Sequence, residues 1–436
     1  MSNEQAKTAV PALGPGPGPV PRLVPRPVPV PGPGPVPRPG PGRYRTGGLL
    51  ALASAAFVYV TAETLPIGLL PQLASGLHVH EWAVGLLVTA YAVVAGLAAL
   101  PVTALLEHRP RRQTIIGAMV LLALSQIAMA VAPGYGVMLA ARLLCALAHG
   151  VFWSLLAPVA ASMAPPGKAG RATAIVFTGN SLALVLGTPL ATAIGQLAGW
   201  RVAMAVLAGA AAMSVVALQA TLPALRPERP AGGLQARFTS MPAALGSRPL
   251  LVLCAVTVFL VIGHFTAYTY IAALVRQDAG LAGLALAAVL LAYGVAGIGG
   301  IALTGWATDR RPRLVVAACT LGLTGALAGL AVLGPGSVVL TVAAAILWGG
   351  AFTAIPVCLQ AAVLRIAPRA AGTASALYVV AFQIGIGGGS LVGAALVGSG
   401  LLRELPAVGA ALVAAGALVL PAGREAFPVR GVADEP

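Results

Sequence analysis

The chain has 436 residues, of which 58% are apolar and only 8% are charged, and its mean hydropathy is +0.93. A soluble domain carries about a quarter of its residues as charged ones, so this composition excludes a soluble globular protein and indicates a chain embedded in a bilayer. The net charge of +15 comes from 26 Lys and Arg against 11 Asp and Glu.

The first segment, residues 1–46, is rich in Pro and Gly with Val and scattered Arg between them. It cannot form a helix or bury a core, so we predict a disordered tail with polyproline-II character. Apolar runs of about 19 residues or more then predict twelve membrane-spanning helices. In chain order they are Gly48–Leu70, Trp82–Leu106, Thr114–Ala132, Val137–Met163, Ala172–Ala198, Val202–Leu222, Leu250–Ala273, Leu284–Ala307, Leu314–Leu333, Val338–Leu364, Gly372–Val397 and Leu405–Leu420.

The distribution of basic residues predicts the orientation of these spans. Of the 26 Lys and Arg, 22 fall in the two tails and in the loops after even-numbered spans, all on one side of the predicted membrane. The positive-inside rule therefore places both termini in the cytoplasm. The positive net charge is then explained by the basic loops on the cytoplasmic side of the membrane. Nucleic-acid binding is not expected, because no compact basic domain is present.

A loop after the second predicted span recurs after the eighth, 202 residues later. Each copy follows a long apolar run and contains an acidic residue, a proline and arginines. The first copy has Glu107, Pro110, Arg111 and Arg112, and the second has Gly305, Asp309, Arg310, Pro312 and Arg313. Duplicated halves of this size are typical of secondary transporters. We therefore predict an all-α membrane protein with two pseudo-symmetric six-helix bundles, residues 47–222 and 250–421, joined by a cytoplasmic linker, 223–249, and followed by a cytoplasmic tail, 422–436.

One acidic residue, Glu63, falls well inside a predicted span. A carboxylate is costly there and usually serves transport or pairs with a cation. Arg142 in the fourth span lies at a similar depth, so we expect the two to approach each other and to couple proton binding to transport. The alternatives are a static buried ion pair, or an Arg142 side chain that extends to the membrane surface.

Polar and aromatic residues recur four positions apart in the first, fourth, seventh and tenth spans, which places each pair on one helix face. With two amides in the fifth and eleventh spans, they predict a cavity for a small polar solute, a sugar especially. The predicted cavity residues are Tyr59, His149, Trp153, Asn180, His264, Tyr268, Trp348 and Gln383. In the fifth span, Gly187 and Pro189 are expected to allow close helix approach and a bend.

These motifs resemble the major facilitator superfamily over residues 47–421. The repeated loops are similar to its G-x-x-x-D-R-x-G-R-R motif, although the first copy has Thr103, Glu107 and Pro110 at the Gly, Asp and second Gly positions. Gly187-Thr-Pro189 is similar to the family's fifth-span exporter motif, and Arg142 to its proton-coupling arginine. Stretches such as Ala62-Glu63-Thr-Leu-Pro and Ala148-His149-Gly-Val-Phe-Trp153 look most like drug:proton antiporters of the sugar-efflux type. The resemblance implies a monomer in the inner membrane that works by rocker-switch alternating access.

The leading hypothesis is proton-coupled export of a sugar or a similar small solute, with the repeated loops as gates. A second hypothesis changes the cargo to a drug such as chloramphenicol. A third is a transport-inactive scaffold or sensor that recruits partners through its Pro-rich tail. An enzyme is not expected, because the sequence has no zinc-protease or phosphate-binding motif, and neither a cofactor nor a metal is expected.

Overall fold

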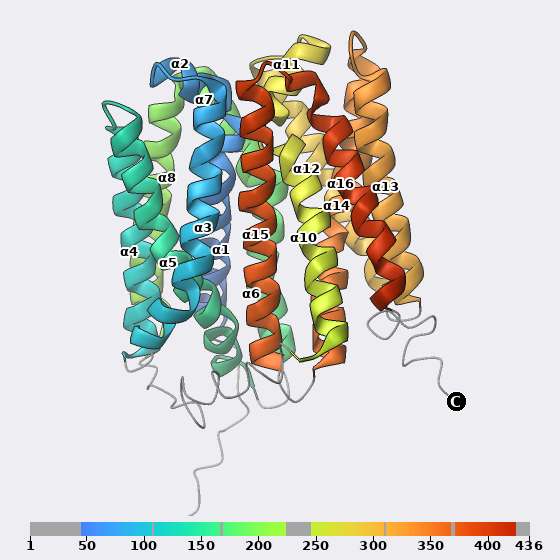
Figure 1. Cartoon of the computed structure of the whole chain (residues 1–436). Helices are drawn as coiled ribbons and strands as arrows, with labels where there is room; N and C mark the ends of the chain where they lie inside the picture. The colour runs from blue at the N-terminus through green and yellow to red at the C-terminus, as the bar shows by residue number, and fades with distance from the viewer. Residues whose placement is uncertain are drawn as a thin grey trace, which may run out of the picture. The chain divides into compact units, whose positions relative to one another are not determined.

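A computed structural model describes residues 45–106, 109–165, 169–223, 246–308, 311–367 and 371–423. The described part is helical, and twelve of its helical spans are long and apolar enough to cross a membrane (Figure 1). The predicted all-α fold and its twelve spans are therefore confirmed. The α-helices are α1 (Thr46–Gly68), α2 (Leu70–Gly76), α3 (Glu81–Leu106), α4 (Arg111–Ala130), α5 (Tyr135–Ser162), α6 (Ala169–Leu182), α7 (Thr188–Ala198), α8 (Trp200–Thr221), α10 (Arg248–Tyr268), α11 (Ile271–Ala279), α12 (Leu284–Thr308), α13 (Pro312–Leu333), α14 (Val338–Ile366), α15 (Ala371–Gly398) and α16 (Leu405–Val419).

Three short elements complete the fold. A π-helical turn, η1 (Ala183–Gly187), joins α6 to α7, and two 3-10 turns, η3 (Leu402–Glu404) and η4 (Leu420–Gly423), flank α16. The predicted tail, 1–46, lies outside the described residues except for its last two, as do most of the linker and of the final tail.

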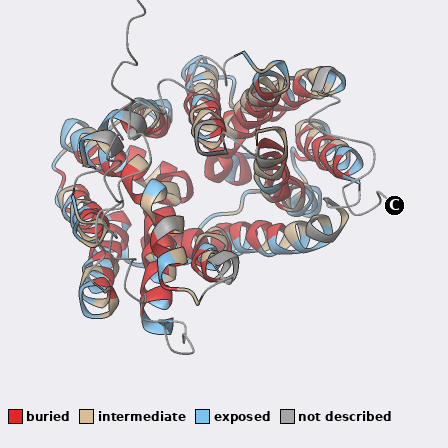
Figure 2. Cartoon of the chain, turned by 90° about the horizontal axis from the view of Figure 1, so that it is seen from below, coloured by how far each residue is buried: buried red, intermediate tan, exposed pale blue. Residues whose placement is uncertain are grey.

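The long helices are apolar on nearly all sides because one side faces other helices and the other faces lipid. Buried residues lie where helices face one another, whereas exposed ones point outward (Figure 2). Large side chains such as Leu303 and Leu418 are about four-fifths exposed, at 78% and 82%. In water such exposure would be costly, but in a bilayer these side chains contact acyl chains as apolar as themselves.

The helices before the linker pack chiefly on one another, as do those after it. Helix α1 packs against α6 and α8, and α4 against α5 and α8, while α10 packs against α15 and α16, and α12 against α14. Several contacts join the two sets: α3 lies along α15, α12 packs against η1 and α7, and α11 packs against α1 and α2.

The short helices α2 and α11 lie at the same end of the long helices, which we call the outer end (Figure 1). The seventh span was predicted to continue to Ala273, and that boundary is wrong. Helix α10 ends at Tyr268 and α11 begins at Ile271. Between them Tyr270, wholly buried, donates a hydrogen bond to the carbonyl of Trp82 on α3 at 3.4 Å. The chain breaks there because Tyr270 turns toward the other set of helices.

An ion pair adds to this contact at the outer end. Arg276 of α11 lies 2.5 Å from the carboxylate of Glu81, the first residue of α3. The Arg276 side chain is 48% exposed. An exposed pair of this kind contributes about 0–1 kcal/mol, so apolar packing is the stronger term in holding the two sets together here.

Asp278 at the end of α11 gives a stability prediction. Asp278 is 5% exposed, and one of its carboxylate oxygens has no hydrogen-bond partner. Burial raises the pKa of the Asp278 carboxyl, and the positive charge of Arg403 offsets only part of this rise. A raised pKa means that the fold disfavours the charged form, so stability is lost as the pH rises above the ordinary value of 3.8. We expect Asp278→Asn to stabilise the protein by about 1 kcal/mol at neutral pH. Thermal unfolding should show this gain vanishing at low pH, with the exposed Glu404→Gln as control; a pH-independent gain would contradict it.

Candidate functional site

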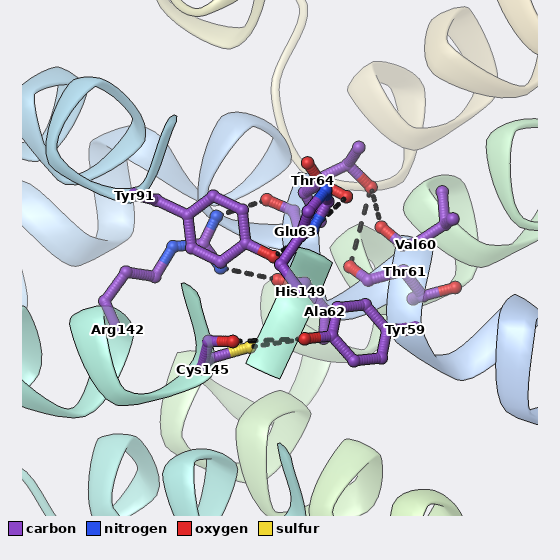
Figure 3. Close-up of polar contacts among 10 residues, drawn as sticks. All are labelled: Tyr59, Val60, Thr61, Ala62, Glu63, Thr64, Tyr91, Arg142, Cys145 and His149. Carbon is purple, nitrogen blue, oxygen red and sulfur yellow. Dashed lines mark hydrogen bonds and ion pairs between the residues drawn. The ribbon is translucent and has the colours of Figure 1, made fainter. Parts of the chain in front are cut away.

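Glu63 lies near the outer part of α1, with 21% of its side chain exposed. Its Oε2 is 3.8 Å from Nδ1 of His149 on α5, and that histidine is 7% exposed (Figure 3). Within the described ranges, the titratable groups facing this carboxylate are Tyr59, Tyr91, Cys145, His149 and Arg142. Helix α11 also packs on α1, but its Arg276 is held by Glu81.

Arg142 lies beside Glu63, as expected, but it binds the backbone of α1 and not the Glu63 carboxylate, so the alternative of a static ion pair between the two side chains is not what the structure has. Its guanidinium donates to the backbone carbonyl of Ala62 at 2.7 Å and to the backbone carbonyl of Glu63 (Figure 3). The guanidinium carbon also lies 4.5 Å from the centre of the Tyr91 ring. Arg142 is 1% exposed, so it does not extend to the membrane surface either.

His149 is the side chain that connects Glu63 to its surroundings. The hydroxyl of Tyr91 on α3 lies 2.8 Å from His149 Nδ1, the same nitrogen that faces Glu63. If Tyr91 donates this bond, His149 carries its proton on Nε2, whereas a protonated His149 donates from Nδ1 to an oxygen. The arrangement therefore lets one proton be held by either the carboxylate or the imidazole. We call Tyr59, Glu63, Tyr91, Arg142 and His149 the carboxylate cluster.

Three aromatic rings extend the carboxylate cluster along α5 and α6. Tyr59 donates to the carbonyl of Cys145 at 3.0 Å, and its ring stacks on Phe152 with centroids 4.5 Å apart. Trp153 lies 6.2 Å from His149 and 6.1 Å from Phe177, between centroids. The predicted residues Tyr59, His149 and Trp153 are thus brought together. Asn180 is half-buried on α6, three residues after Phe177.

Three of the four predicted cavity residues after the linker form a second group. Trp348 on α14 donates from Nε1 to His264 Nδ1 on α10 at 2.8 Å. The His264 ring is stacked between Phe352 and Tyr268, with centroids 3.3 Å and 4.7 Å away. Tyr293 of α12 adds a ring 5.2 Å from Tyr268. We call His264, Tyr268, Tyr293, Trp348 and Phe352 the aromatic cluster; in the described residues, none of these ring or hydrogen-bond contacts reaches the carboxylate cluster.

Sequence reasoning missed Tyr91 and Tyr293. It searched for polar pairs four residues apart on one helix, and each of these tyrosines instead meets its partners from a neighbouring helix. The signal that could have found them is a tyrosine inside the second and eighth spans, the corresponding helix of each half. Gln383, which was predicted, lies on α15 at its contact with Gly96 of α3, 5% exposed and with its Nε2 atom unpaired.

The glycines of the fifth span make the close approach expected of them. Gly179, Gly187 and Gly195 recur every eight residues, and a side chain at each would collide with Ala53, Thr61 and Leu69, which recur at the same interval along α1 and at the residue just after it. Pro189 has no N–H for the carbonyl four residues earlier, and the π turn η1 occurs just there. Pro189 therefore follows an interruption of the regular α-helix, whereas the bend and the gating role expected of Gly187 and Pro189 stay predictions.

The repeated loops are only partly described. Glu107, Asp309 and Arg310 lie outside the described residues, and Gly305 falls in the last turn of α12. Arg111 begins α4, and Arg112 donates to the carbonyl of Gln219 on α8 at 2.5 Å. Arg313 is exposed in the first turn of α13. The bridge from Arg112 thus joins two helices of the same set.

Comparison with known proteins gives the family. Residues 52–390 match the family model described as Major Facilitator Superfamily. Chloramphenicol efflux pumps of two Mycobacterium tuberculosis strains, CDC 1551 / Oshkosh and ATCC 25618 / H37Rv, are each 40% identical over 368 residues, 82% of this chain and 88% of theirs. These names do not support the expected sugar-exporter resemblance.

Solved structures show the same fold at low sequence identity. A bacterial homologue of the human lysosomal transporter Spinster, inward-facing and unoccupied, has a TM-score of 0.71 at 15% identity, with 88% of this chain and 98% of that chain covered. The nucleoside transporter NupG has a TM-score of 0.70 at 13% identity, with 87% and 100% covered. With more than half of its length matched by the family model, the chain belongs to the major facilitator superfamily and is a multi-pass membrane transporter.

Proposed function

We propose that this transporter exports chloramphenicol or a similar amphipathic drug in exchange for protons. The observation that carries the proposal is the 40% identity, over most of both chains, to pumps named for chloramphenicol efflux. Chloramphenicol is a neutral molecule with a nitroaromatic ring, an amide and two hydroxyls. Flat rings such as Trp153 and Tyr268 offer stacking to an aromatic ring, and Asn180 and Gln383 offer hydrogen bonds to an amide or hydroxyl.

The proton would be taken up at the carboxylate cluster. Glu63 is well inside a span, where a carboxylate is kept only for a specific use. Its neighbour His149 offers a ring nitrogen 3.8 Å from the carboxylate that can hold a proton as well. With the basic loops on the cytoplasmic side, α2 and α11 would face outward, so Glu63 would lie closer to the outer surface, from which protons enter.

A paired transport assay tests the cargo. Expressed in a bacterium made drug-sensitive by loss of its own pumps, the protein should raise the chloramphenicol concentration that inhibits growth. Cells should also accumulate less labelled chloramphenicol until a protonophore is added. Labelled arabinose, tested in the same cells, should distribute as in cells without the protein. Export of arabinose with unchanged chloramphenicol tolerance would reverse the proposal in favour of a sugar exporter.

A further inference from the structure

Pro66 lies inside α1, four residues after Ala62. In an α-helix the carbonyl of residue 62 would accept a hydrogen bond from the N–H of residue 66, and proline has no N–H to donate. The carbonyl of Ala62 is nevertheless satisfied, because Arg142 of α5 donates to it at 2.7 Å. The arginine therefore replaces the bond that the proline removes.

The surroundings of Arg142 fit this backbone role better than a charge-pairing role. Burying a guanidinium without a carboxylate partner is costly unless its N–H groups are bonded. Two carbonyls on the turn before Pro66 accept from Arg142 Nη1 and Nη2, and the Tyr91 ring lies under its charge at 4.5 Å, although the buried Nε has no hydrogen-bond partner. Both carbonyls belong to the turn that carries Glu63, so Arg142 fixes the backbone from which the carboxylate projects.

We propose that Arg142 is a positioning residue. By capping the carbonyls of Ala62 and Glu63, it holds the turn of α1 before Pro66 so that the Glu63 carboxylate faces His149. This proposal rests on the proposed function in assigning the proton to Glu63. It differs from direct charge pairing in one respect: what matters is a hydrogen-bond donor at the Ala62 carbonyl, and the positive charge is dispensable if another donor is supplied.

The chain offers such a donor by mutation, since Pro66→Ala restores an N–H opposite the Ala62 carbonyl. We expect Arg142→Gln to slow pH-driven chloramphenicol export about 10- to 100-fold, the loss typical of a hydrogen bond from a charged group. Arg142→Gln should also shift the pH midpoint of export, because the Glu63 carboxylate would no longer be held facing His149. Adding Pro66→Ala to Arg142→Gln should recover most of the rate and return the midpoint to that of the wild type, without any charge at position 142.

Three outcomes would overturn the proposal. If the pH midpoint stays shifted in the double variant, the arginine acts through its charge. If Arg142→Gln lowers the rate without moving the midpoint, its role is general stability. Recovery with Pro101→Ala, which removes a helix-interior proline from α3, would show that the rescue is not specific to the Ala62 carbonyl.

A cargo-independent measurement separates this proposal from the identity of the drug. Thermal unfolding of the four purified proteins (wild type, the two single variants and the double variant) forms a double-mutant cycle. We expect the loss in midpoint temperature caused by Arg142→Gln to be at least halved in the Pro66→Ala background. Additive losses would overturn the capping role even if chloramphenicol is exported, whereas strong coupling in a protein that exports no chloramphenicol would overturn only the cargo.

Discussion

Replacing Glu63 with glutamine is expected to abolish the part of chloramphenicol export that a pH gradient drives. Glutamine keeps the size and hydrogen-bonding capacity of the side chain but cannot gain or lose a proton at physiological pH. His149 then has no ionisable carboxylate at 3.8 Å. Within the described spans, no other carboxylate lies as far from a span end as that of Glu63 and could take its place. Without a proton to carry back, the protein can only equilibrate its cargo.

The measurement uses inverted membrane vesicles with an imposed pH gradient. Wild-type vesicles should accumulate labelled chloramphenicol, and Glu63→Gln vesicles should not. Exchange of labelled for unlabelled chloramphenicol without a gradient should persist in the variant, because exchange moves no net proton. Glu81→Gln, which removes the acid paired with Arg276, is the matched control and should still accumulate the drug. Equal accumulation by wild type and Glu63→Gln would remove Glu63 from the coupling mechanism.

The twelve spans could be predicted because the length of an apolar helix is set by the bilayer, a constraint that is visible in any single sequence. The boundary between α10 and α11 could not, because the apolar run continues past it. There the turn is set by Tyr270, whose hydroxyl reaches α3 of the other set of helices. A contact between segments that are distant in the sequence does not change the local hydropathy, so the sequence pattern could not predict it.

The carboxylate cluster could also be predicted only in part from the sequence. Depth along each helix correctly placed Arg142 near Glu63, but depth does not say which atom the guanidinium binds. That choice follows from Pro66, which leaves a backbone carbonyl without its donor at the position that Arg142 reaches. The proline was visible in the sequence, so a search for acceptors four residues before each helix proline would have found the contact. The Tyr91–His149 bond depends on two helices meeting and had no such local signal.

The predicted cavity residues fall into two separate clusters. Four-residue spacing identified helix faces that are rich in aromatic residues, and each face does carry a ring cluster. It could not say whether the faces from the two halves meet, because that depends on the conformational state. In the present state the aromatic cluster is closed on itself, with Trp348 only 1% exposed. We therefore expect cargo to reach these rings only after the buried cluster opens.

Gly294→Val is expected to slow export by forcing α12 away from η1, without unfolding either set of helices. Gly294 of α12 faces η1 so closely that a Cβ atom would lie 2.6 Å from the Cα of Val185 and 2.8 Å from the carbonyl oxygen of Leu184. Both are backbone atoms, so neither can rotate away, and the two sets must separate. Overpacking of this kind typically costs about 1–3 kcal/mol, which disfavours the arrangement with α12 packed against η1 by roughly 5- to 150-fold.

Export measured in vesicles should fall by a similar factor, because we expect every transport cycle to form the packed contact between α12 and η1 again. Chloramphenicol should still shift the thermal unfolding midpoint of purified Gly294→Val, since neither ring cluster is changed. Gly299→Val is the matched control on the same helix: Gly299 is exposed, a Cβ there would meet nothing within 4 Å, and export should stay at the wild-type rate. If Gly294→Val exports as fast as Gly299→Val, the contact between α12 and η1 is not one that the transport cycle must reform.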